Sequence, residues 1–315
     1  MVRQKTILHN YFINLDISES SKRTYNYALR RLKKLSPNED LKILNYPDKV
    51  DVLISKIAIK SQQIIYTSII NYFKVNDPNN LLLLTEYRKR SKERQTSITK
   101  LRMEQKLNKK IVDNFVYLAD LKRVSGLIRQ ELKAIRDTSS TNFLKLTQWD
   151  LIINLYIKYP IRLEFGDMLI IKYKDYKKLN DTDINKTNYL IVAKTKIYIQ
   201  LNNYKTIKTM GQIRYDVSRY LKTLIKRWLI ILPSNNTSFL INYRTKQPLL
   251  RQGLHDTLKS IFKKYLNLKN VGVNAIRHAR ISELNKNEKS LKDKKTECVQ
   301  FLHTQFEHDL YRHIE

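Results

Sequence analysis

Apolar residues recur at helical spacing along the first quarter of the chain. In residues 18–36 they fall three or four positions apart, after the N-cap candidates Ser18 and Ser20 and before the helix breaker Pro37. Residues 61–75 repeat this spacing and end before an Asp-Pro pair. The pattern predicts a small helical domain at the N-terminus.

The middle of the chain is polar and strongly basic. Residues 87–110 hold few apolar positions, which is typical of a linker or a solvated helix, so we expect a domain boundary there. Helical spacing returns over residues 111–121 and 125–136, and the polar stretch 137–141 follows. We therefore predict three regions: a helical domain at 1–85, a basic linker with helices at 86–140, and a C-terminal domain at 141–315.

The C-terminal region mixes two periodicities. Helical spacing covers residues 151–159, which Pro160 ends, and returns at 217–228 and 254–266. Short apolar runs rich in β-branched and aromatic residues predict strands at 169–173, 189–193, 196–201 and 239–243. The predicted fold class is an α-helical N-terminal domain plus a mixed α+β, mainly helical C-terminal domain with a small antiparallel sheet.

The charge of the chain favours a polyanionic partner. The 315 residues carry 60 Lys and Arg against 29 Asp and Glu, a formal net charge of +31. Nucleic acid is the usual polyanion for such a composition. Codon supply in an AT-rich genome is an alternative source of part of the lysine, but acidic residues are not enriched in step. The helix predicted at 18–36 carries the candidate DNA-binding residues, Lys22, Arg23, Arg30, Arg31, Lys33 and Lys34.

Several other classes of protein are disfavoured by composition. The longest apolar runs are far shorter than the roughly 20 residues that cross a bilayer, so we expect no membrane association. The five glycines form no phosphate-binding loop, which disfavours nucleotide hydrolysis. The single Cys298 forms no internal disulfide, and the first residues, MVRQKTILHNYF, do not read as a signal peptide, so a reducing compartment is expected.

Three polar islands interrupt the apolar pattern of the C-terminal region. The first holds Arg162, the second holds Arg277, and the third lies at the C-terminal end. An arginine between apolar residues needs a partner for its guanidinium group, and a carboxylate is the commonest one. Glu164 and Asp167 offer a carboxylate to Arg162. Arg277 has only Glu283 nearby, which favours an anionic ligand.

In their order, these islands resemble the tyrosine recombinase (phage-integrase) family, in which an Arg, a Lys on a β-hairpin, a His-x-x-Arg, a His and a Tyr follow one another. Arg162 in YPIRLEFGDML resembles the first arginine box, and Arg277 in NAIRH resembles the second. His303 in FLHT matches the third box, and Tyr311 in LYRH matches the nucleophile box. Lys205 in NNYKTIKTMG is our choice for the hairpin lysine. The N-terminal helices resemble the family's core-binding domain.

The resemblance implies DNA strand cleavage and rejoining through a covalent 3′-phosphotyrosine, with no cofactor and no metal. Two arginines would hold the extra charge of a pentacoordinate phosphoryl group. Tyr311, a phenol with an ordinary pKa of about 10, would attack the phosphorus, and Lys205 would protonate the departing 5′ oxygen. His303 would hydrogen-bond the phosphate or help Tyr311 lose its proton. The alternatives for the lysine are its neighbours Lys194, Lys196 and Lys208.

Three further residues receive supporting roles. Asn274 stands where the second box of the family begins with a histidine, so proton transfer there would be weaker or would be supplied by His278. Glu164 is interpreted, with Asp167, as a partner that orients Arg162. The structural alternative for each arginine is an ordinary ion pair.

The expected partners follow from the resemblance. We expect double-stranded DNA, a homotetramer on that DNA and no membrane, with a role in integrating or excising a viral or mobile genome. The site of action would be intracellular, in host cytoplasm, a viral factory or the nucleus. The alternative functions are a type IB topoisomerase and a non-catalytic DNA-binding relative. A metal nuclease built on His303, His308 and His313 is a third, but their i, i+5 spacing spreads the rings around a helix, so no metal is expected.

Overall fold

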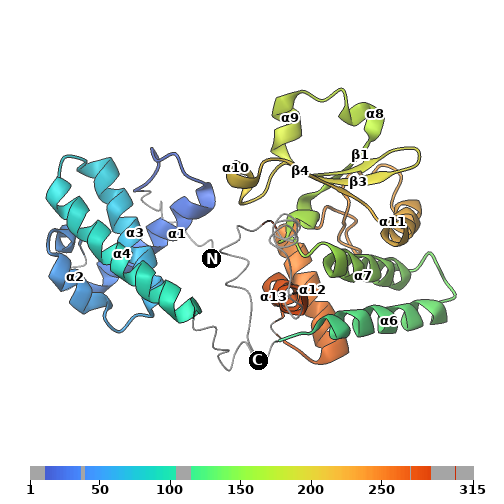
Figure 1. Ribbon diagram of the computed structural model, residues 1–315, viewed down its shortest axis with the longest axis horizontal. Coiled ribbons are helices and arrows are strands. Elements are labelled where there is room, and N and C mark those ends of the chain that lie inside the picture. Colours follow the sequence, from blue (N-terminus) through green and yellow to red (C-terminus); the bar gives the residue numbers. More distant parts are fainter. Residues whose placement is uncertain (1–10, 37–39, 104–114, 270, 285–301, 303–315) are drawn as a thin grey trace, which may run out of the picture. The chain divides into compact units, whose positions relative to one another are not determined.

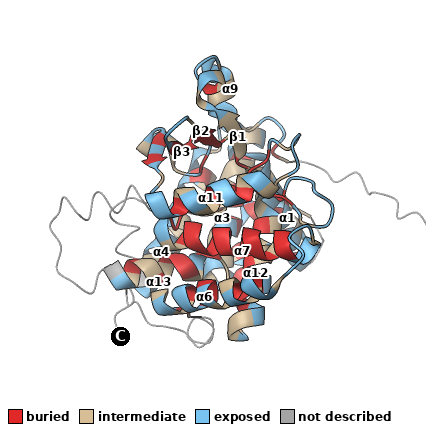
Figure 2. Ribbon diagram, turned by 90° about the vertical axis from the view of Figure 1, so that its right-hand side faces the viewer, coloured by how far each residue is buried: buried red, intermediate tan, exposed pale blue. Residues whose placement is uncertain are grey.

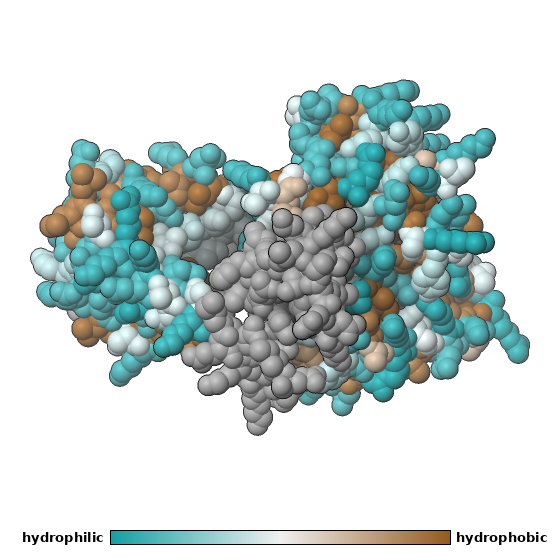
Figure 3. Space-filling view, in the orientation of Figure 1, coloured by the Kyte–Doolittle hydropathy of each residue, from teal (hydrophilic) through white to brown (hydrophobic). Residues whose placement is uncertain are grey.

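The computed structural model of the protein describes residues 11–36, 40–103, 115–269, 271–284 and 302 (Figure 1). The chain forms two compact units, Met1–Glu104 and Gln105–Glu315. Among the described residues, no helix is long and apolar enough to span a bilayer. Hydrophilic side chains cover much of the face drawn in Figure 3, with smaller apolar patches between them.

The first unit is helical. It contains α1 (Glu19–Leu35), the 3-10 helix η1 (Lys42–Asn45), α2 (Pro47–Ile54), α3 (Ile59–Asn76) and α4 (Leu81–Met103). The Ser18 hydroxyl caps α1 by accepting a hydrogen bond of 3.2 Å from the Ser21 amide. Leu29 and Leu32 of α1 join Ile65 of α3 in the buried core. The helices predicted at 18–36 and 61–75 are therefore confirmed as α1 and α3.

Helix α4 occupies most of the polar stretch that we predicted to be a linker or a solvated helix. It begins at Leu81 and runs through residue 86, where we had placed a boundary, and the first unit ends after it. Leu84 and Tyr87 are buried in the core of the unit, and the Tyr87 hydroxyl donates to the Leu44 carbonyl at 2.8 Å. Polar contacts add to this attachment, because Arg90 Nε donates to Asp51 Oδ2 at 2.7 Å and Arg94 Nε donates to Gln62 Oε1 at 2.8 Å.

The first helices described in the second unit are α6 (Leu118–Ala134) and α7 (Thr141–Lys158). We predicted two helices, over 111–121 and 125–136. One continuous helix covers 118–134, and residues 111–114 lie outside the described residues. Its buried residues Leu121, Val124 and Ile128 keep helical spacing across the predicted break. Because this face packs in the same core as α7, α6 belongs to the second unit, which therefore begins before residue 141.

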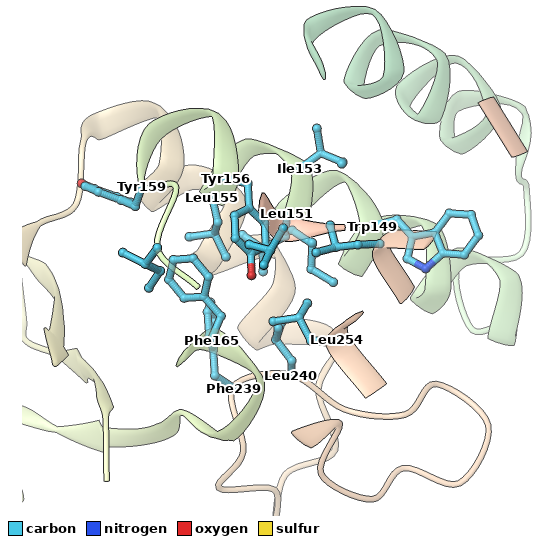
Figure 4. Packing of buried hydrophobic residues seen from close by; sticks show 14 of the residues in the cluster. Trp149, Leu151, Ile153, Leu155, Tyr156, Tyr159, Phe165, Phe239, Leu240 and Leu254 are labelled. Atoms are coloured by element: carbon cyan, nitrogen blue, oxygen red, sulfur yellow. The ribbon is translucent and has the colours of Figure 1, made fainter. Parts of the chain in front are cut away.

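Helix α7 is the centre of the second core. Figure 2 shows it buried along most of its length, and Figure 4 shows its side chains meeting Phe165, Leu240 and Leu254 from other parts of the chain. The remaining long helices are α11 (Arg219–Ile231), α12 (Leu250–Leu266) and α13 (Val273–Leu284). The predicted helices at 151–159, 217–228 and 254–266 correspond to α7, α11 and α12.

The described residues of this unit contain a four-stranded sheet in the order β1 (Leu169–Lys172), β2 (Tyr189–Val192), β3 (Ile197–Leu201) and β4 (Ile213–Asp216). We predicted an antiparallel sheet, but β1 and β2 are parallel and the other pairs antiparallel, so the sheet is mixed. The cause is the crossover through the short helices α8 (Tyr173–Tyr176) and α9 (Asp181–Lys186). These helices cover one face of the sheet, and the main core covers the other (Figure 1).

The strand predicted at 239–243 is wrong. Phe239, Leu240 and Ile241 are fully buried, but this segment makes only isolated bridges. The buried side chain of Gln148 takes the place of a neighbouring strand: its amide donates to the Ile241 carbonyl at 3.0 Å, and the Ile241 amide donates back to its oxygen at 2.9 Å. The backbone of this apolar run is therefore hydrogen-bonded without pairing in a β-ladder.

Candidate active site

The loop that carries Arg162 begins where α7 ends. Pro160 follows the last residues of α7, and the chain then turns into the 3-10 helix η2 (Glu164–Asp167). The Tyr156 hydroxyl donates a hydrogen bond of 2.6 Å to the Arg162 carbonyl. Burial raises the pKa of Tyr156 well above its ordinary value, so this hydroxyl keeps its proton and stays a donor. The backbone at Arg162 is thus held from inside the core.

Arg277 meets the same loop from α13. Its side chain is fully buried, and its Nη1 donates to the Pro160 carbonyl at 2.8 Å, across 117 residues of sequence. A fully buried guanidinium group is rare without charged or polar partners. The bond brings the two candidate arginine boxes together at the end of α7.

The Arg162 side chain has spare hydrogen-bonding capacity. Its Nη1 is buried and has no hydrogen-bond partner among the described residues. A buried donor left without an acceptor destabilises a fold by about 1–3 kcal/mol. An oxygen acceptor would satisfy this donor. Glu164 Oε2 and Asp167 Oδ1, in the same loop, are likewise buried without a hydrogen-bond partner among the described residues.

Glu164 is the acidic residue at the centre of this cluster. It is only 2% exposed, and burial raises the pKa of its carboxyl above the ordinary value. The guanidinium groups of Arg251, Arg277 and Arg162 each oppose that rise. Three arginines from three different segments are therefore close enough to Glu164 to act on the pKa of its carboxyl.

Asp167 pairs with an arginine that sequence reasoning did not select. We expected it to orient Arg162, but its Oδ2 accepts from Arg251 Nε at 2.6 Å. Arg251 lies at the start of α12, and its Nη2 also donates to the Asn203 carbonyl at 3.2 Å. One guanidinium group therefore contacts both the Arg162 loop and the loop that contains Lys205.

Lys205 is exposed on the loop between β3 and β4. Buried Asn188 shapes this loop, because its Oδ1 accepts from the amides of Asn202 and Asn203 at 2.9 Å each and its Nδ2 donates to the Asn203 carbonyl at 3.0 Å. Of the alternative lysines, Lys208 lies in the short helix α10 (Ile207–Met210).

Lys194 and Lys196 lie at the other end of β3. They are exposed in the turn that joins β2 to β3. Five residues of β3 separate that turn from the Lys205 loop, a rise of roughly 16 Å at 3.3 Å per residue. The hydrogen bond between Arg251 and Asn203 holds the backbone of the Lys205 loop, whereas the tight turn of the β2–β3 hairpin carries Lys194 and Lys196.

Of residues 285–315, the structure describes Leu302. Leu302 is fully buried in the main core, and its carbonyl accepts a hydrogen bond of 3.0 Å from the Thr206 hydroxyl. Thr206 directly follows Lys205, and Leu302 directly precedes His303 in the sequence. His303 and Tyr311 themselves lie outside the described residues, as do Cys298, His308 and His313.

The two other supporting residues lie on α13. Asn274 is exposed in the first turn, three residues before Arg277, and His278 is half-buried directly after it. Residues three apart share one face of a helix, so Asn274 and Arg277 face the same side. Within the described ranges, no group of three or more His, Cys, Asp or Glu side chains could hold a metal ion.

The candidate DNA-binding residues lie on α1 in the first unit. Arg23, Arg31, Lys33 and Lys34 are exposed, whereas Lys22 and Arg30 are half-buried. Lys22 is engaged within the unit: its Nζ donates to the Ile13 carbonyl at 3.1 Å and pairs with Glu19 at 3.2 Å. The helix therefore presents exposed cations opposite its buried apolar face.

Comparison with known proteins gives little likeness in sequence. No family model matches the chain, and no match was found among curated proteins. Among solved structures, the crystal structure of XerA recombinase is similar to this chain at 10% sequence identity and a TM-score of 0.42, over 95% of this chain and 89% of that chain.

Sequence reasoning missed the residues that hold the cluster together. Arg251 carried the same signal that selected Arg162, an arginine in an apolar setting at a helix boundary, in the sequence LLRQGL. Asn188 and Thr206 carried no signal, because asparagine and threonine are ordinary loop residues whose distant partners the local pattern does not reveal.

Proposed function

We propose that the protein cleaves and rejoins DNA strands through a covalent 3′-phosphotyrosine formed on Tyr311. The observation that carries the proposal is the hydrogen bond from Arg277 to the Pro160 carbonyl, which brings Arg277 beside the loop of Arg162. The buried Nη1 of Arg162, which lacks a partner among the described residues, adds a donor for an anionic oxygen. Two guanidinium groups can stabilise the charge that develops on a pentacoordinate phosphoryl group.

The proposed reaction conserves the energy of the broken bond. The Tyr311 oxygen attacks the phosphorus, the bond from phosphorus to the 5′ oxygen breaks, and that oxygen takes a proton from Lys205. The phenolic proton passes to His303 or to water. Rejoining is the reverse, in which a 5′ hydroxyl attacks the phosphotyrosine and Tyr311 leaves. No nucleotide triphosphate is consumed.

The hydrogen bond between Thr206 and Leu302 supports the proposed roles of Lys205 and His303. Each of these two candidates adjoins one of the bonded residues in sequence. The bond spans 96 residues and ends on a fully buried leucine. It is the kind of contact expected if the lysine loop and the third box serve one site.

The biological setting belongs to the same proposal and is supported by the sequence resemblance and the charge of +31. The partner would be double-stranded DNA, gripped by the exposed cations of α1 and exchanged within a tetramer. The role would be integration or excision of a viral or mobile genome, at DNA inside the cell. Glu164, Asn274 and His278 would support the two arginines.

The experiment begins with a DNA site, selected by repeated binding from a pool of randomised duplexes. A suicide version of that site, nicked beside the cleavage position, is then incubated with the protein in EDTA. We expect an adduct that survives denaturation, is lost in Tyr311→Phe, and persists in the matched control Tyr46→Phe, whose tyrosine is 54% exposed in the first unit.

Each alternative has its own signature. Binding of the selected site without any adduct would overturn the proposal in favour of a non-catalytic DNA-binding protein. Relaxation of any supercoiled plasmid regardless of site would indicate a topoisomerase. Cleavage that requires added divalent ions and survives Tyr311→Phe would indicate a metal nuclease.

A further inference from the structure

Arg214 lies on the face of the sheet opposite the main core. Along β4 the side chains alternate: Ile213 and Tyr215 are buried in the main core, and Arg214 is exposed on the other side. Its partner in the register is Gln200 of β3. Arg214 Nε donates to Gln200 Oε1 at 2.7 Å, so one edge of the guanidinium group is attached to the sheet.

Two tyrosine rings hold this guanidinium group. Its central carbon lies 5.4 Å from the centroid of the Tyr198 ring and 5.8 Å from the centroid of the Tyr176 ring. Tyr176 in turn makes an edge-to-face contact with Tyr189, with 5.5 Å between the ring centroids. Guanidinium groups interact favourably with aromatic faces, so these contacts restrict a side chain that is mobile on most protein surfaces.

The acceptor that Arg214 uses is itself held in place. Gln200 is 4% exposed, and its Nε2 donates to Asn202 Oδ1 at 2.8 Å. The backbone amide of Asn202 donates to Oδ1 of buried Asn188 at 2.9 Å. Because Asn202 binds the nitrogen end of the Gln200 amide, the oxygen end faces Arg214. The position of the guanidinium group is therefore set by a supporting shell of buried polar side chains.

The outer edge of the guanidinium group keeps its donors. Among the described residues, Arg214 Nη1 and Nη2 form no hydrogen bond, and no carboxylate pairs with them. This includes Asp216, which lies two residues further along the same face of β4. Two parallel donors match two adjacent acceptors, such as two oxygens of a phosphate or the O6 and N7 atoms of guanine.

A second cation stands near Arg214 on the same side of the sheet. The Tyr198 ring lies 6.3 Å from the Tyr173 ring, and Lys177 Nζ lies 4.9 Å from the centroid of the Tyr173 ring. Lys177 is exposed and has no ion pair within the described ranges. Cations and rings thus follow one another from α8 to β4. Two cations without acidic partners, in a chain of net charge +31, favour a polyanionic ligand.

We propose that Arg214 binds two adjacent acceptors of duplex DNA. The acceptors are two oxygens of one backbone phosphate, or O6 and N7 of one guanine. The inference rests on the proposed function for the identity of the ligand as duplex DNA. Tyr198, Tyr176 and Gln200 order the side chain before DNA binds, so little of its conformational freedom remains to be lost on binding.

Arg214→Lys separates the fork of donors from the charge. An ammonium group keeps the positive charge but cannot present two parallel donors. On the DNA site selected with wild type, we expect roughly tenfold weaker binding, measured by fluorescence anisotropy. The matched control is Arg136→Lys, at an exposed arginine after α6, which should bind within about twofold of wild type. Wild-type affinity in Arg214→Lys would overturn the inference.

Salt and sequence preference distinguish the two kinds of acceptor. If Arg214 binds a phosphate, Arg214→Ala should reduce the slope of log K against log salt by about 0.9 and weaken all sequences alike. If it binds a guanine, sites selected with Arg214→Ala should lose a preference for G at one position. A variant that changes neither the slope nor the selected site would overturn the inference.

Chemical modification gives a readout that needs no variant. Phenylglyoxal reacts with exposed guanidinium groups, and peptide mass spectrometry reports the extent of reaction at each arginine. The selected DNA site should slow the modification of Arg214 severalfold relative to that of Arg136. If Arg214 only covers the tyrosine rings, DNA will not protect it, and Arg214→Ala will lower the melting temperature with wild-type affinity for DNA. That result would overturn the inference.

These outcomes are distinct from those of the proposed strand cleavage. If wild type binds its selected site and forms no adduct, the proposed chemistry fails, and protection of Arg214 by DNA still decides the inference. If wild type forms the adduct while Arg214 is unprotected and Arg214→Lys binds like wild type, only the inference fails. If no duplex is selected from the randomised pool, both fail.

Discussion

Arg277 Nη1 donates a hydrogen bond of 2.8 Å to the carbonyl oxygen of Pro160. Pro160 ends α7, the most buried helix of the second unit, and Arg162 follows two residues later. The Pro160 carbonyl lies beyond the end of α7, outside the helical hydrogen bonds, so as a buried group it needs a donor from elsewhere. The buried Arg277 guanidinium group therefore stabilises the chain at the end of α7, in addition to its proposed role in binding phosphate.

The structural role and the proposed phosphate-binding role can be separated by replacing Arg277 with lysine. Arg277→Lys retains the charge, but one ammonium group cannot bond the Pro160 carbonyl and also present a fork to a phosphate. We expect a loss of about 1–2 kcal/mol in the free energy of unfolding and at least about 100-fold slower adduct formation. Urea unfolding and suicide-substrate kinetics measure the two effects. Cleavage at the wild-type rate would remove Arg277 from the proposed site.

The charge state of Glu164 should appear in the pH dependence of stability. Burial raises its pKa above the ordinary 4.5 in the folded protein, so the folded state binds this proton more tightly than the unfolded state. The resulting stability is fully present below pH 4.5 and is lost as pH rises through the folded pKa. Gln does not titrate, so Glu164→Gln should gain stability relative to wild type across that window.

Urea unfolding of both proteins from about pH 4 to about pH 8 measures this difference. The opposite slope, with wild type gaining on Glu164→Gln as pH rises, would mean that the three arginines outweigh burial and keep the carboxylate ionised. Glu131→Gln is a control, since its carboxylate is partly exposed and pairs with Lys264 at 2.5 Å on the surface.

The helices of this protein could be predicted from sequence because each depends on a local pattern. The spacing of Leu29 and Leu32, with Ser18 before them, identifies α1 without knowledge of any other segment. The parallel pairing of β1 with β2 could not be predicted in this way. It depends on whether the chain crosses over after residue 172, and α8 and α9 are too short to show a clear period.

The candidate site was only partly accessible to sequence reasoning for the same reason. Arg162 and Arg277 stand out because a charge in an apolar setting is conspicuous locally. The side chains that connect segments do so through distant backbone, as Gln148 does with Ile241 and Arg251 with Asn203. Such partners depend on the packed fold, and no local periodicity encodes them.

The hydrogen bond from Thr206 to Leu302 predicts that the Thr206 hydroxyl stabilises the attachment of Leu302 to the loop between β3 and β4. Thr206→Val keeps the shape of the side chain but leaves the buried Leu302 carbonyl without this donor. We expect a loss of about 1–2 kcal/mol in the free energy of unfolding and slower adduct formation. Thr223→Val is the matched control, because the Thr223 hydroxyl bonds only within its own helix, to the Arg219 carbonyl at 3.2 Å.

Urea unfolding of the two valine variants tests this expectation. Equal stability losses would mean that the Thr206 hydroxyl contributes no more than a local helix bond. In that case the loop between β3 and β4 would not depend on Leu302. The bond would then give no support to a site shared by Lys205 and His303.

Tyr204 is the tyrosine nearest to Lys205 in sequence and is an obvious rival to Tyr311 as nucleophile. Burial raises its pKa to about 12, with Glu164 adding to the rise, and its hydroxyl donates to the Gly211 carbonyl at 2.5 Å. A phenol of this kind stays protonated at neutral pH. We expect Tyr204→Phe to form the covalent adduct and to lose about 1 kcal/mol in the free energy of unfolding. Loss of the adduct in Tyr204→Phe, with its retention in Tyr311→Phe, would assign attack to Tyr204.

The basic face of α1 makes a prediction about salt. If Arg31 contacts a DNA phosphate, Arg31→Ala should reduce the slope of log K against log salt by about 0.9, the value for one released counterion on duplex DNA. Lys22 offers a control on the same helix, because its ammonium group is held by the Ile13 carbonyl and by Glu19. We expect Lys22→Ala to lower the free energy of unfolding by up to about 1 kcal/mol and to leave the slope unchanged. Fluorescence anisotropy on duplex DNA between about 50 and 200 mM salt measures both slopes. Arg31 and Lys22 carry the same charge, but only the ammonium group of Lys22 is bound by partners inside the unit. Equal slope changes in the two variants would therefore show that net charge, and not the exposed face of α1, governs DNA binding.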